Sequence, residues 1–442
     1  MVKSLLAPTH GIGGATDLPI PLPAAIIAGV TALVASFAIL VVAWREPRYY
    51  GHQHGKLLPT AMGAALDSPG FRWSIRGLGL VFFGYATWAM IFGPDLITNP
   101  TLGIFYVLVW VGLVPASLLF GPIVRLLSPL RTLHLLATKM IGIKADKGLA
   151  SYPGRLGYWP AALGLFGFVW QELVNPNSTY VSSVQLWLAI YAGAMLVGAA
   201  AFGDIWFARA DPFEVFATLI GKLSIWGRDP KGRPLVRSPL ANLAHVEIAP
   251  GLVAVVSVLL GSTAFDSFKA TSRWYAMTSP LAGHEQAMNT LGLIGFCVFV
   301  AVTFTMAARA TPSAQTTKQA LPNLYASSVI PIIVGYFVAH YLTYFYQMSQ
   351  QTLIQLSDPL AQGSNLLGTA SWQLHYGLSN FPTPLAITKV AAIVVGHILG
   401  AVMAHDRAVS TIPKPHRLTG QLAMMATMVG YTTVGLFLLF SS

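Results

Sequence analysis

The sequence predicts an all-α protein, a polytopic membrane bundle of about ten transmembrane helices. Hydrophobic residues make up 55% of its 442 residues and charged residues only 9%, and the mean hydropathy is +0.63. Soluble domains carry about 25% charged residues. Such an apolar excess cannot be buried in one soluble core, because the surface of a soluble protein also needs polar cover. The composition therefore excludes a soluble enzyme, a nucleic-acid-binding domain and a disulfide scaffold.

Ten stretches of mostly apolar sequence have the length of about 20 residues that a membrane crossing requires. They lie at 22–44, 74–93, 102–121, 158–175, 184–207, 249–268, 288–309, 325–349, 384–404 and 420–441. Pro21 and Pro23 open the first and Pro250 opens the sixth, a match that would fit two halves of five spans related by an inverted repeat, as in many secondary transporters. The third and fifth stretches end least sharply, at Gly121 and Gly203.

The basic residues orient the predicted spans. Of the 26 Lys and Arg residues, 22 fall in or beside the segments that follow spans 1, 3, 5, 7 and 9. Segments rich in Lys and Arg stay in the cytoplasm, next to anionic lipid of the inner leaflet. The sequence therefore predicts that both chain termini lie on the outer side. This charge pattern explains the net charge of +11 without a nucleic-acid partner.

We expect one transmembrane domain over residues 1–442, with possible halves at 1–210 and 249–442 and no separate soluble domain. The two longest inner segments, 122–157 and 208–248, are basic and too short for a domain. Each opens with apolar residues at helical spacing, at 123, 126, 127 and 130 and at 213, 216, 219, 220 and 223. These patterns predict two amphipathic helices that lie at the inner membrane interface.

The eighth span carries the most informative polar residues. Tyr336, His340, Tyr344 and Gln347 recur at intervals that place them on one face of a helix. An ionisable group inside a bilayer is costly unless it is paired or hydrated. The stripe therefore predicts either a path for protons or substrate, or a polar seam between two helices.

The ninth span adds His397 and Lys389 to this candidate site. Gly396, Gly400 and Ala404 follow small-residue spacing, which lets another helix approach closely. Lys389 fits either a side chain that reaches to the outer surface or an anion-attracting group. The span ends at Ala404-His-Asp-Arg407. This end suggests a solvated helix terminus, or alternatively an ion pair with another loop.

Two carboxylates complete the candidate residues. Asp266 lies near the outer end of span 6, and Glu172 lies near the outer end of span 4. Together with Lys389 they would form an outer vestibule. The hydroxyls of span 10, on Thr427, Tyr431, Thr432 and Thr433, are expected to bond back to their own helix.

These residues favour a secondary transporter or permease of a small solute or ion, coupled to protons through His340 and His397. The alternative is a membrane subunit of a redox complex that binds haem b or quinone. The predicted depths of the two histidines differ, which suits a proton path better than the two axial ligands of one haem. A noncatalytic scaffold is a third reading.

No phosphate-binding loop or hydrolase motif is present, which disfavours an enzyme, and neither a catalytic residue nor a metal site is assigned. The pattern names no cofactor. The expected partners are anionic lipids and a small solute or ion, with room for an oligomer or a larger complex. The expected location is the cell membrane, as a multi-pass protein of a prokaryotic inner membrane.

Overall fold

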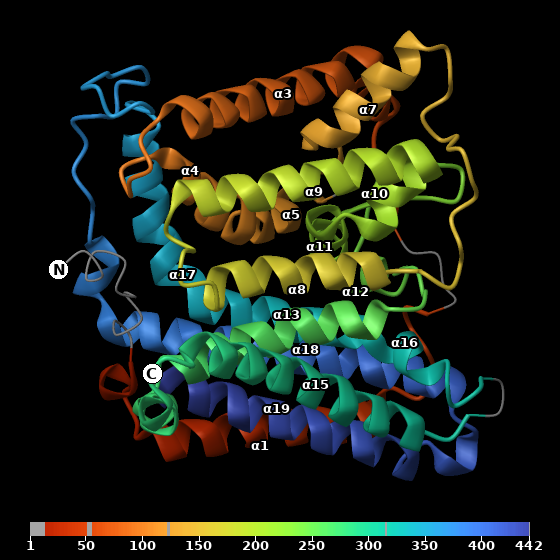
Figure 1. Cartoon of the computed structure of the whole chain (residues 1–442). Coiled ribbons are helices and arrows are strands. Elements are labelled where there is room, and N and C mark those ends of the chain that lie inside the picture. The colour runs from red at the N-terminus through yellow and green to blue at the C-terminus, as the bar shows by residue number, and fades with distance from the viewer. Residues whose placement is uncertain (1–13, 51–54, 122–123, 314–315, 442) are drawn as a thin grey trace. The chain divides into compact units, whose positions relative to one another are not determined.

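The computed structural model describes residues 14–50, 55–121, 124–313 and 316–441. The chain is 72% helical, so the predicted all-α class is confirmed (Figure 1). It divides into two compact units. Unit 1 comprises residues 1–51, 256–348 and 374–442, and unit 2 comprises residues 52–255 and 349–373. The first helix thus belongs with the C-terminal helices, while the predicted halves at 1–210 and 249–442 stay a prediction.

Six long helices form unit 1 within the described residues. They are α1 (Leu22–Ala43), α13 (Leu252–Lys269), α15 (Glu285–Ala310), α17 (Ile330–Gln355), α18 (Pro382–Thr411) and α19 (Leu422–Ser441). Short helices join them: η3 (Ala15–Asp17), α14 (Ser272–Thr278), η6 (Ser279–Leu281), α16 (Leu321–Tyr325), η7 (Ala326–Val329), η8 (Gly377–Asn380), η9 (Lys414–His416) and η10 (Thr419–Gln421). The first residues of α13 and the last of α17 fall in unit 2.

Two ends of unit 1 can be distinguished by their contacts. At one end, Leu22 of α1 packs with Phe440 of α19 and Ala386 of α18 in a single apolar cluster. At the other end, Trp44, directly after α1, bonds to Asp406 near the end of α18. The start of α1 and the end of α19 therefore lie at the same end of the unit. We call this the terminal end, and the end that contains Trp44 the latch end.

Glycines bring α17 and α18 into backbone contact. A Cβ atom added to Gly335 of α17 would lie 2.3 Å from the carbonyl oxygen of Ala392 on α18. A Cβ added to Gly396 would lie 2.6 Å from the oxygen of Pro331, and one added to Gly400 would lie 2.7 Å from that of Ser328. Any larger residue would force the helices apart, so the close approach predicted from Gly396 and Gly400 is confirmed. The seam places His397 beside α17.

Unit 2 contains the remaining helices and a small sheet. Its helices are α2 (Thr60–Asp67), α3 (Pro69–Phe92), α4 (Pro100–Leu102), η4 (Gly103–Val111), α5 (Leu113–Phe120), α6 (Val124–Leu127), α7 (Pro129–Met140), α8 (Trp159–Leu173), α9 (Val181–Phe202), α10 (Asp204–Ala210), α11 (Pro212–Gly221) and α12 (Pro239–Leu243). Strands β1 (Lys56–Leu57), β2 (Trp226–Arg228) and β3 (Pro234–Val236) pair antiparallel in the order β1-β3-β2. The segment η4 is a π-helix.

The described residues give eight helices long and apolar enough to cross a membrane, or nine if the bent pair Pro100–Val111 and Leu113–Phe120 is one span. The sequence predicts ten. The one predicted span without a counterpart among these helices is 158–175, where the structure has the 15-residue helix α8. At 1.5 Å per residue it rises only about 22 Å, less than the roughly 30 Å of a bilayer core. Several long apolar helices make the chain a multi-pass helical membrane protein, and the eight or nine helices are candidates for its spans.

The prediction of an interfacial helix in segment 208–248 is wrong. Nine of the ten residues of α11 are buried, because α11 packs against α5, α8 and α10 inside unit 2. Its polar residues are satisfied there. Asp211 caps the helix by accepting hydrogen bonds from the backbone of Phe213 and Glu214, and burial raises the pKa of Asp211 to about 7. Apolar spacing alone does not tell a buried helix from an interfacial one.

A buried ion pair fixes α11 to α7. Arg131 donates from Nε to Oε2 of Glu214 at 2.8 Å and from Nη2 to Oε1 at 2.7 Å. Both side chains are 4% exposed, and Nη1 of Arg131 also lies 3.2 Å from Oδ1 of Asp204.

The segment 122–157, for which the sequence predicts the other interfacial helix, contains two helices, α6 and α7, which are separated at Ser128-Pro129. Residues 122 and 123 lie outside the described residues, and α7 turns the polar residues Arg131, Thr132 and His134 inward.

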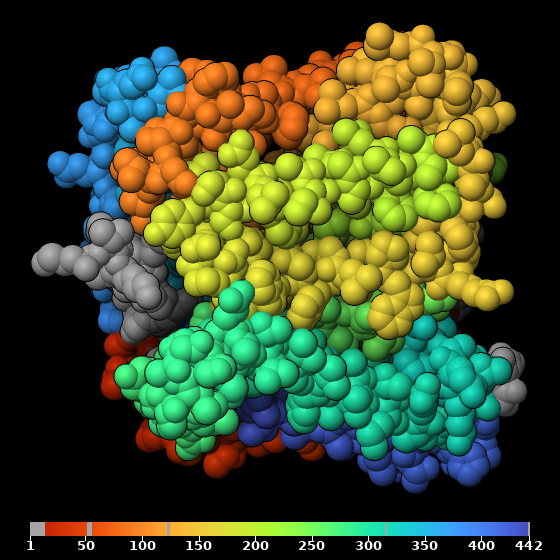
Figure 2. Space-filling model, viewed as in Figure 1, coloured from red at the N-terminus to blue at the C-terminus, as the bar shows by residue number. Residues whose placement is uncertain are grey.

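Apolar side chains cover the outward faces of both units. In unit 1, α15 exposes Leu291, Ile294, Val298, Phe299, Val302 and Met306, and this helix forms a broad green surface in Figure 2. In unit 2, α9 exposes Leu186, Ile190 and Val197. Apolar faces of this size are stable next to lipid and unstable in water, as the membrane assignment requires.

Replacing Glu214 with Gln should strongly destabilise the protein, because it leaves the guanidinium of Arg131 buried without its bidentate partner. Breaking a buried pair on one side costs roughly 3–5 kcal/mol, so the melting temperature of the detergent-purified protein should fall clearly. The matched control is Glu247→Gln, because the Glu247 side chain is 69% exposed in its pair with Arg209 and such pairs contribute little. Equal melting temperatures for both variants would contradict this account.

Candidate functional site

An Asp–His pair joins α13 and α17 inside unit 1. Nε2 of His340 lies 2.8 Å from Oδ2 of Asp266, and the hydroxyl of Tyr341 donates to the same oxygen at 3.2 Å. His340 is 5% exposed, and the Asp266 side chain is 21% exposed. The structure thus brings together two of the predicted site residues, and the carboxylate is the member of the pair that is more open to the surroundings.

A serine extends this pair into a chain of hydrogen bonds. Oγ of Ser267 lies 3.1 Å from Nδ1 of His340, and the hydroxyl of Tyr336 donates to Oγ at 2.8 Å. Since the serine oxygen accepts from Tyr336, its own proton is free to point at Nδ1. Nε2 then carries the ring proton and donates to Asp266, whose carboxylate can only accept. The result is a continuous chain Tyr336–Ser267–His340–Asp266.

The chain ends at a cavity of about 50 Å³. Tyr336 and His397 both line it, together with Tyr431 and with apolar residues from α13, α15, α17 and α19. Nδ1 of His397 lies 2.8 Å from the carbonyl oxygen of Ile393, so Nδ1 must be the donor. Nε2 of His397 has no hydrogen-bond partner within the part of the chain that the structure describes, although the residue is only 1% exposed.

The tyrosine of α19 differs from its neighbouring threonines. Tyr431 bonds across to α15, at 2.7 Å from Oγ1 of Thr303 and 3.2 Å from the oxygen of Val300. Thr427, Thr432 and Thr433 donate to carbonyls four residues earlier in α19. The expectation that the hydroxyls of span 10 bond to their own helix is confirmed for the three threonines. It is wrong for Tyr431, which bonds across to α15 and lines the cavity.

The remaining predicted residues lie further from this chain. On α17, Tyr344 is half-buried, and Gln347 is 2% exposed with neither amide atom partnered among the described residues. On α18, Lys389 is buried eight residues before His397 and interacts electrostatically with Asp17. Glu172 is half-buried on α8 of unit 2. The predicted vestibule of Asp266, Glu172 and Lys389 stays a prediction.

The latch end of unit 1 is built on Asp406, which is fully buried. Its Oδ1 accepts from the indole of Trp44 at 2.8 Å and from the backbone N–H of Arg48 at 2.5 Å. Its Oδ2 accepts from the backbone N–H groups of Tyr49 and Tyr50, both at 3.0 Å. The interpretation of this helix end as solvated is wrong. One carboxylate instead organises the loop after α1, because consecutive N–H groups form a natural anion-binding turn.

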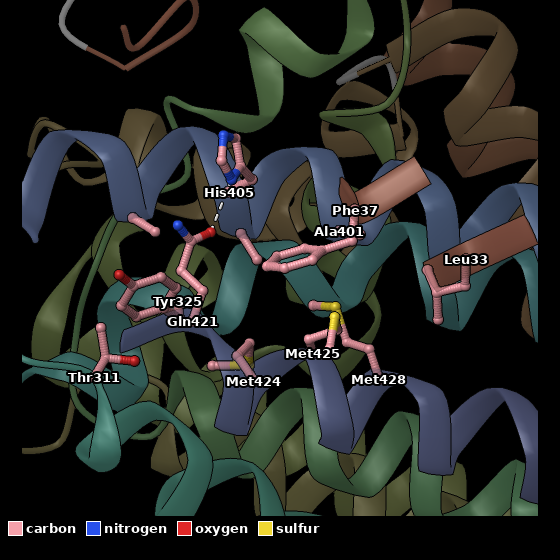
Figure 3. A pocket seen from close by; sticks show the side chains of 12 residues that line it. Leu33, Phe37, Thr311, Tyr325, Ala401, His405, Gln421, Met424, Met425 and Met428 are labelled. Carbon is pink, nitrogen blue, oxygen red and sulfur yellow. Dashed lines mark hydrogen bonds between the residues drawn. The ribbon is translucent and has the colours of Figure 1, made fainter. Parts of the chain in front are cut away.

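His405 of α18 also bonds to the segment after α1, beside a second, smaller cavity of about 20 Å³. Its Nε2 lies 2.9 Å from the carbonyl oxygen of Trp44 and its Nδ1 lies 2.8 Å from Oε1 of Gln421. Figure 3 shows this imidazole bonded to Gln421, with the thioethers of Met424, Met425 and Met428 elsewhere around the cavity. The described residues contain no group of three His, Cys, Asp or Glu side chains placed to hold a metal.

In comparisons with known proteins, no family model, curated protein or solved structure matches this chain. The function therefore has to be argued from the geometry of the site.

Replacing Asp406 with Asn should release the loop after α1. An amide can accept at only one of its two positions, and its NH₂ would face the backbone N–H groups. A hydrogen bond to a charged group contributes about 1.5–3 kcal/mol, so amide exchange in a peptide covering 44–50 should accelerate by roughly tenfold or more. The control is Asp358→Asn, since Asp358 caps backbone N–H groups of Gln362 and Gly363 in unit 2. An unchanged rate of amide exchange at residues 44–50 in Asp406→Asn would contradict the conclusion that Asp406 holds the loop after α1.

Proposed function

We propose that the protein is a secondary transporter of a small solute or ion, coupled to protons through the chain Tyr336–Ser267–His340–Asp266. The observation that carries the proposal is that this chain runs from a half-open carboxylate to a cavity where His397 presents an unpartnered nitrogen. Ionisable groups inside membrane helices are costly and typically mark substrate or proton paths.

The hydrogen-bond pattern supports proton movement. When Asp266 takes the proton from Nε2 of His340, Nδ1 can take the proton of Ser267, and Ser267 can take that of Tyr336. Each step breaks one O–H or N–H bond and forms another at the neighbouring atom. Tyr336 regains a proton from a donor in the cavity, and Asp266 releases its proton to the outside, so that one proton passes between the cavity and Asp266 without any group leaving its place. Histidine suits this role because its two ring nitrogens exchange donor and acceptor roles.

The distribution of Lys and Arg residues supports the predicted orientation of the protein in the membrane. Near the latch end the chain segments of unit 1 carry Arg45, Arg48, Arg309, Lys318, Arg407, Lys414 and Arg417. Lys269 and Arg273 follow α13 on the other side. By the positive-inside rule the latch end would face the cytoplasm, where anionic lipid is the expected partner. Asp266 and both chain termini would then face outward, in the cell membrane of a prokaryote.

The alternative of a haem or quinone subunit has less support. Both ring nitrogens of His340 already face protein partners, so iron ligation would have to break one of these bonds. The cavity beside His397, about 50 Å³, is small against the roughly 300–1,000 Å³ of pockets for cofactor-sized ligands. We therefore expect the purified protein to be colourless, in oxidised and dithionite-reduced absorbance spectra alike. Stoichiometric haem bands would overturn the proposal.

The transport proposal predicts that His340→Ala and Asp266→Asn abolish proton movement. The protein would be reconstituted into vesicles that contain a pH-sensitive dye, with a defined panel of small solutes on both sides and a potassium-diffusion potential as driving force. The wild type should change the internal pH faster than protein-free vesicles, and each variant should lose at least about nine-tenths of the excess rate, because each breaks the chain.

His416→Ala is the matched control, since His416 is exposed and outside the chain, and it should behave as the wild type. Equal amounts of monodisperse protein would be compared in every case. A wild-type rate in His340→Ala, or no excess rate in the wild type, would contradict the proposal.

A further inference from the structure

Both ring nitrogens of His405 lie against acceptor oxygens, although this residue is only 2% exposed. Nε2 lies 2.9 Å from the carbonyl oxygen of Trp44, and Nδ1 lies 2.8 Å from Oε1 of Gln421, the bond drawn in Figure 3. We propose that His405 is a pH switch at the latch end. Its imidazolium form holds the loop after α1, residues 44–50, and loss of the ring proton loosens this loop. The switch is a property beyond transport and does not depend on any solute.

The hydrogen-bond partners of His405 define its protonation state. A carbonyl oxygen can only accept, so Nε2 of the ring donates to Trp44. The amide nitrogen of Gln421 donates to the backbone oxygen of Arg417, which leaves the amide oxygen of Gln421 facing His405. Turning the amide over would place its oxygen against the carbonyl oxygen of Arg417, where no hydrogen bond can form. Nδ1 therefore donates as well, and a histidine that donates from both ring nitrogens is an imidazolium.

A buried carboxylate beside this ring favours the charged form of His405. Asp406 is fully buried, and its partners among the described residues are uncharged indole and backbone N–H groups of the loop after α1. Trp44 bonds to both side chains, because its carbonyl oxygen accepts from His405 and its indole donates to Asp406. A buried charge is less costly when a charge of opposite sign is near. The imidazolium and the carboxylate thus hold the loop with opposite charges.

Other titratable groups near His405 respond to pH differently. The charged and titratable side chains on the surrounding elements are Arg45, Glu46, Arg48, Tyr49 and Tyr50 after α1, Arg309 of α15, Tyr325 of α16, Asp406 and Arg407 of α18, and Lys414, His416 and Arg417 before α19. Lysine, arginine and tyrosine ordinarily titrate well above neutral pH and carboxylates well below it. Protonation of Asp406 would loosen the loop as the pH falls, which is the opposite direction.

A rise in pH weakens the hold on the loop. Neutral His405 keeps a single N–H donor, so a ring lone pair faces the oxygen of either Trp44 or Gln421. The loop then loses one hydrogen bond to a charged group, and the carboxylate of Asp406 loses a neighbouring positive charge. The loop is therefore held at low pH and loosened as His405 loses its proton. Under the proposed orientation the latch end faces the cytoplasm, so the switch responds to cytoplasmic pH.

The test is amide exchange in the detergent-purified protein, followed by mass spectrometry in a peptide covering 44–50 from about pH 5 to 9. Each rate is compared with that of the same peptide in unfolded protein, which removes the intrinsic pH dependence of exchange. Protection at 44–50 should be high at the acidic end and fall roughly tenfold or more as the pH rises, because one hydrogen bond to a charged group is lost. A peptide from α9 should keep its protection.

Two variants change the ring and its partner. His405→Gln cannot carry a charge, so protection at 44–50 should be low throughout and should lose the transition. Gln421→Glu places a carboxylate beside Nδ1 and stabilises the imidazolium, so the transition should move to higher pH. A residue that only fills space at position 405 would give no such shift. His416→Ala is the matched control, since His416 is exposed, and it should keep the wild-type transition.

Nitrogen NMR of protein labelled in its histidine rings reports the protonation state directly. At about pH 6 the pair of signals that His405→Gln lacks should show a bonded proton on both ring nitrogens, and above the transition on one only. If His405→Gln is not monodisperse, the wild-type pH series and the shift in Gln421→Glu still decide the outcome.

Three results would each overturn the switch. They are wild-type protection at 44–50 that does not fall with rising pH, a wild-type transition that persists in His405→Gln, and a neutral His405 ring at acidic pH. A transition that disappears in His416→Ala would assign it to that residue instead. The proton flux into vesicles is a separate measurement, so its absence would overturn the transport proposal and leave the switch.

Discussion

The cost of leaving a polar group without a partner in an apolar interior governs this structure. A polar group that is buried without a hydrogen-bond partner destabilises the fold. Glu214 therefore meets Arg131, Asp406 meets four N–H donors, and Asp266 meets His340 and Tyr341. Each of these contacts joins segments far apart in the sequence and so fixes the packing of its unit. Nε2 of His397 belongs to the smaller set of buried polar atoms that lack a partner among the described residues, as do both amide atoms of Gln347, and function is expected at atoms of this kind.

The sequence predicts the positions of the helices better than it predicts the hydrogen-bond partners of their polar side chains. Eight of the ten expected spans have a counterpart among the candidate spans of the described residues, and nine have one if the bent pair counts as one span, because hydropathy and length are properties of one segment. The stripe on α17 includes His340, which bonds to Asp266 in the structure, and the small residues of α18 mark the seam that holds His397. Ser267, by contrast, gives no signal of its own. One serine among the many of a membrane protein acquires its role only when α13 packs against α17.

The errors have the same physical origin. Phe213 and Phe216 on α11 suggested an interfacial helix, and Asp406 suggested a solvated helix end. Both readings assumed that polar neighbours imply water nearby. In the structure the polar neighbours are satisfied by protein, through Arg131 for Glu214 and through the backbone at 48–50 for Asp406. A partner of this kind is set by tertiary contact, which the spacing of residues along one segment does not contain.

Helix α18 links the two polar regions of unit 1. His397 and Asp406 lie nine residues apart on this continuous helix, a rise of roughly 13 Å. Asp406 holds one end of α18 to the loop after α1, and the glycine seam holds its middle against the backbone of α17. With the helix fixed at both places, the orientation of His397 toward the cavity is set by the scaffold. Such preorganisation is what a site needs if a single imidazole nitrogen is to meet its ligand in one orientation.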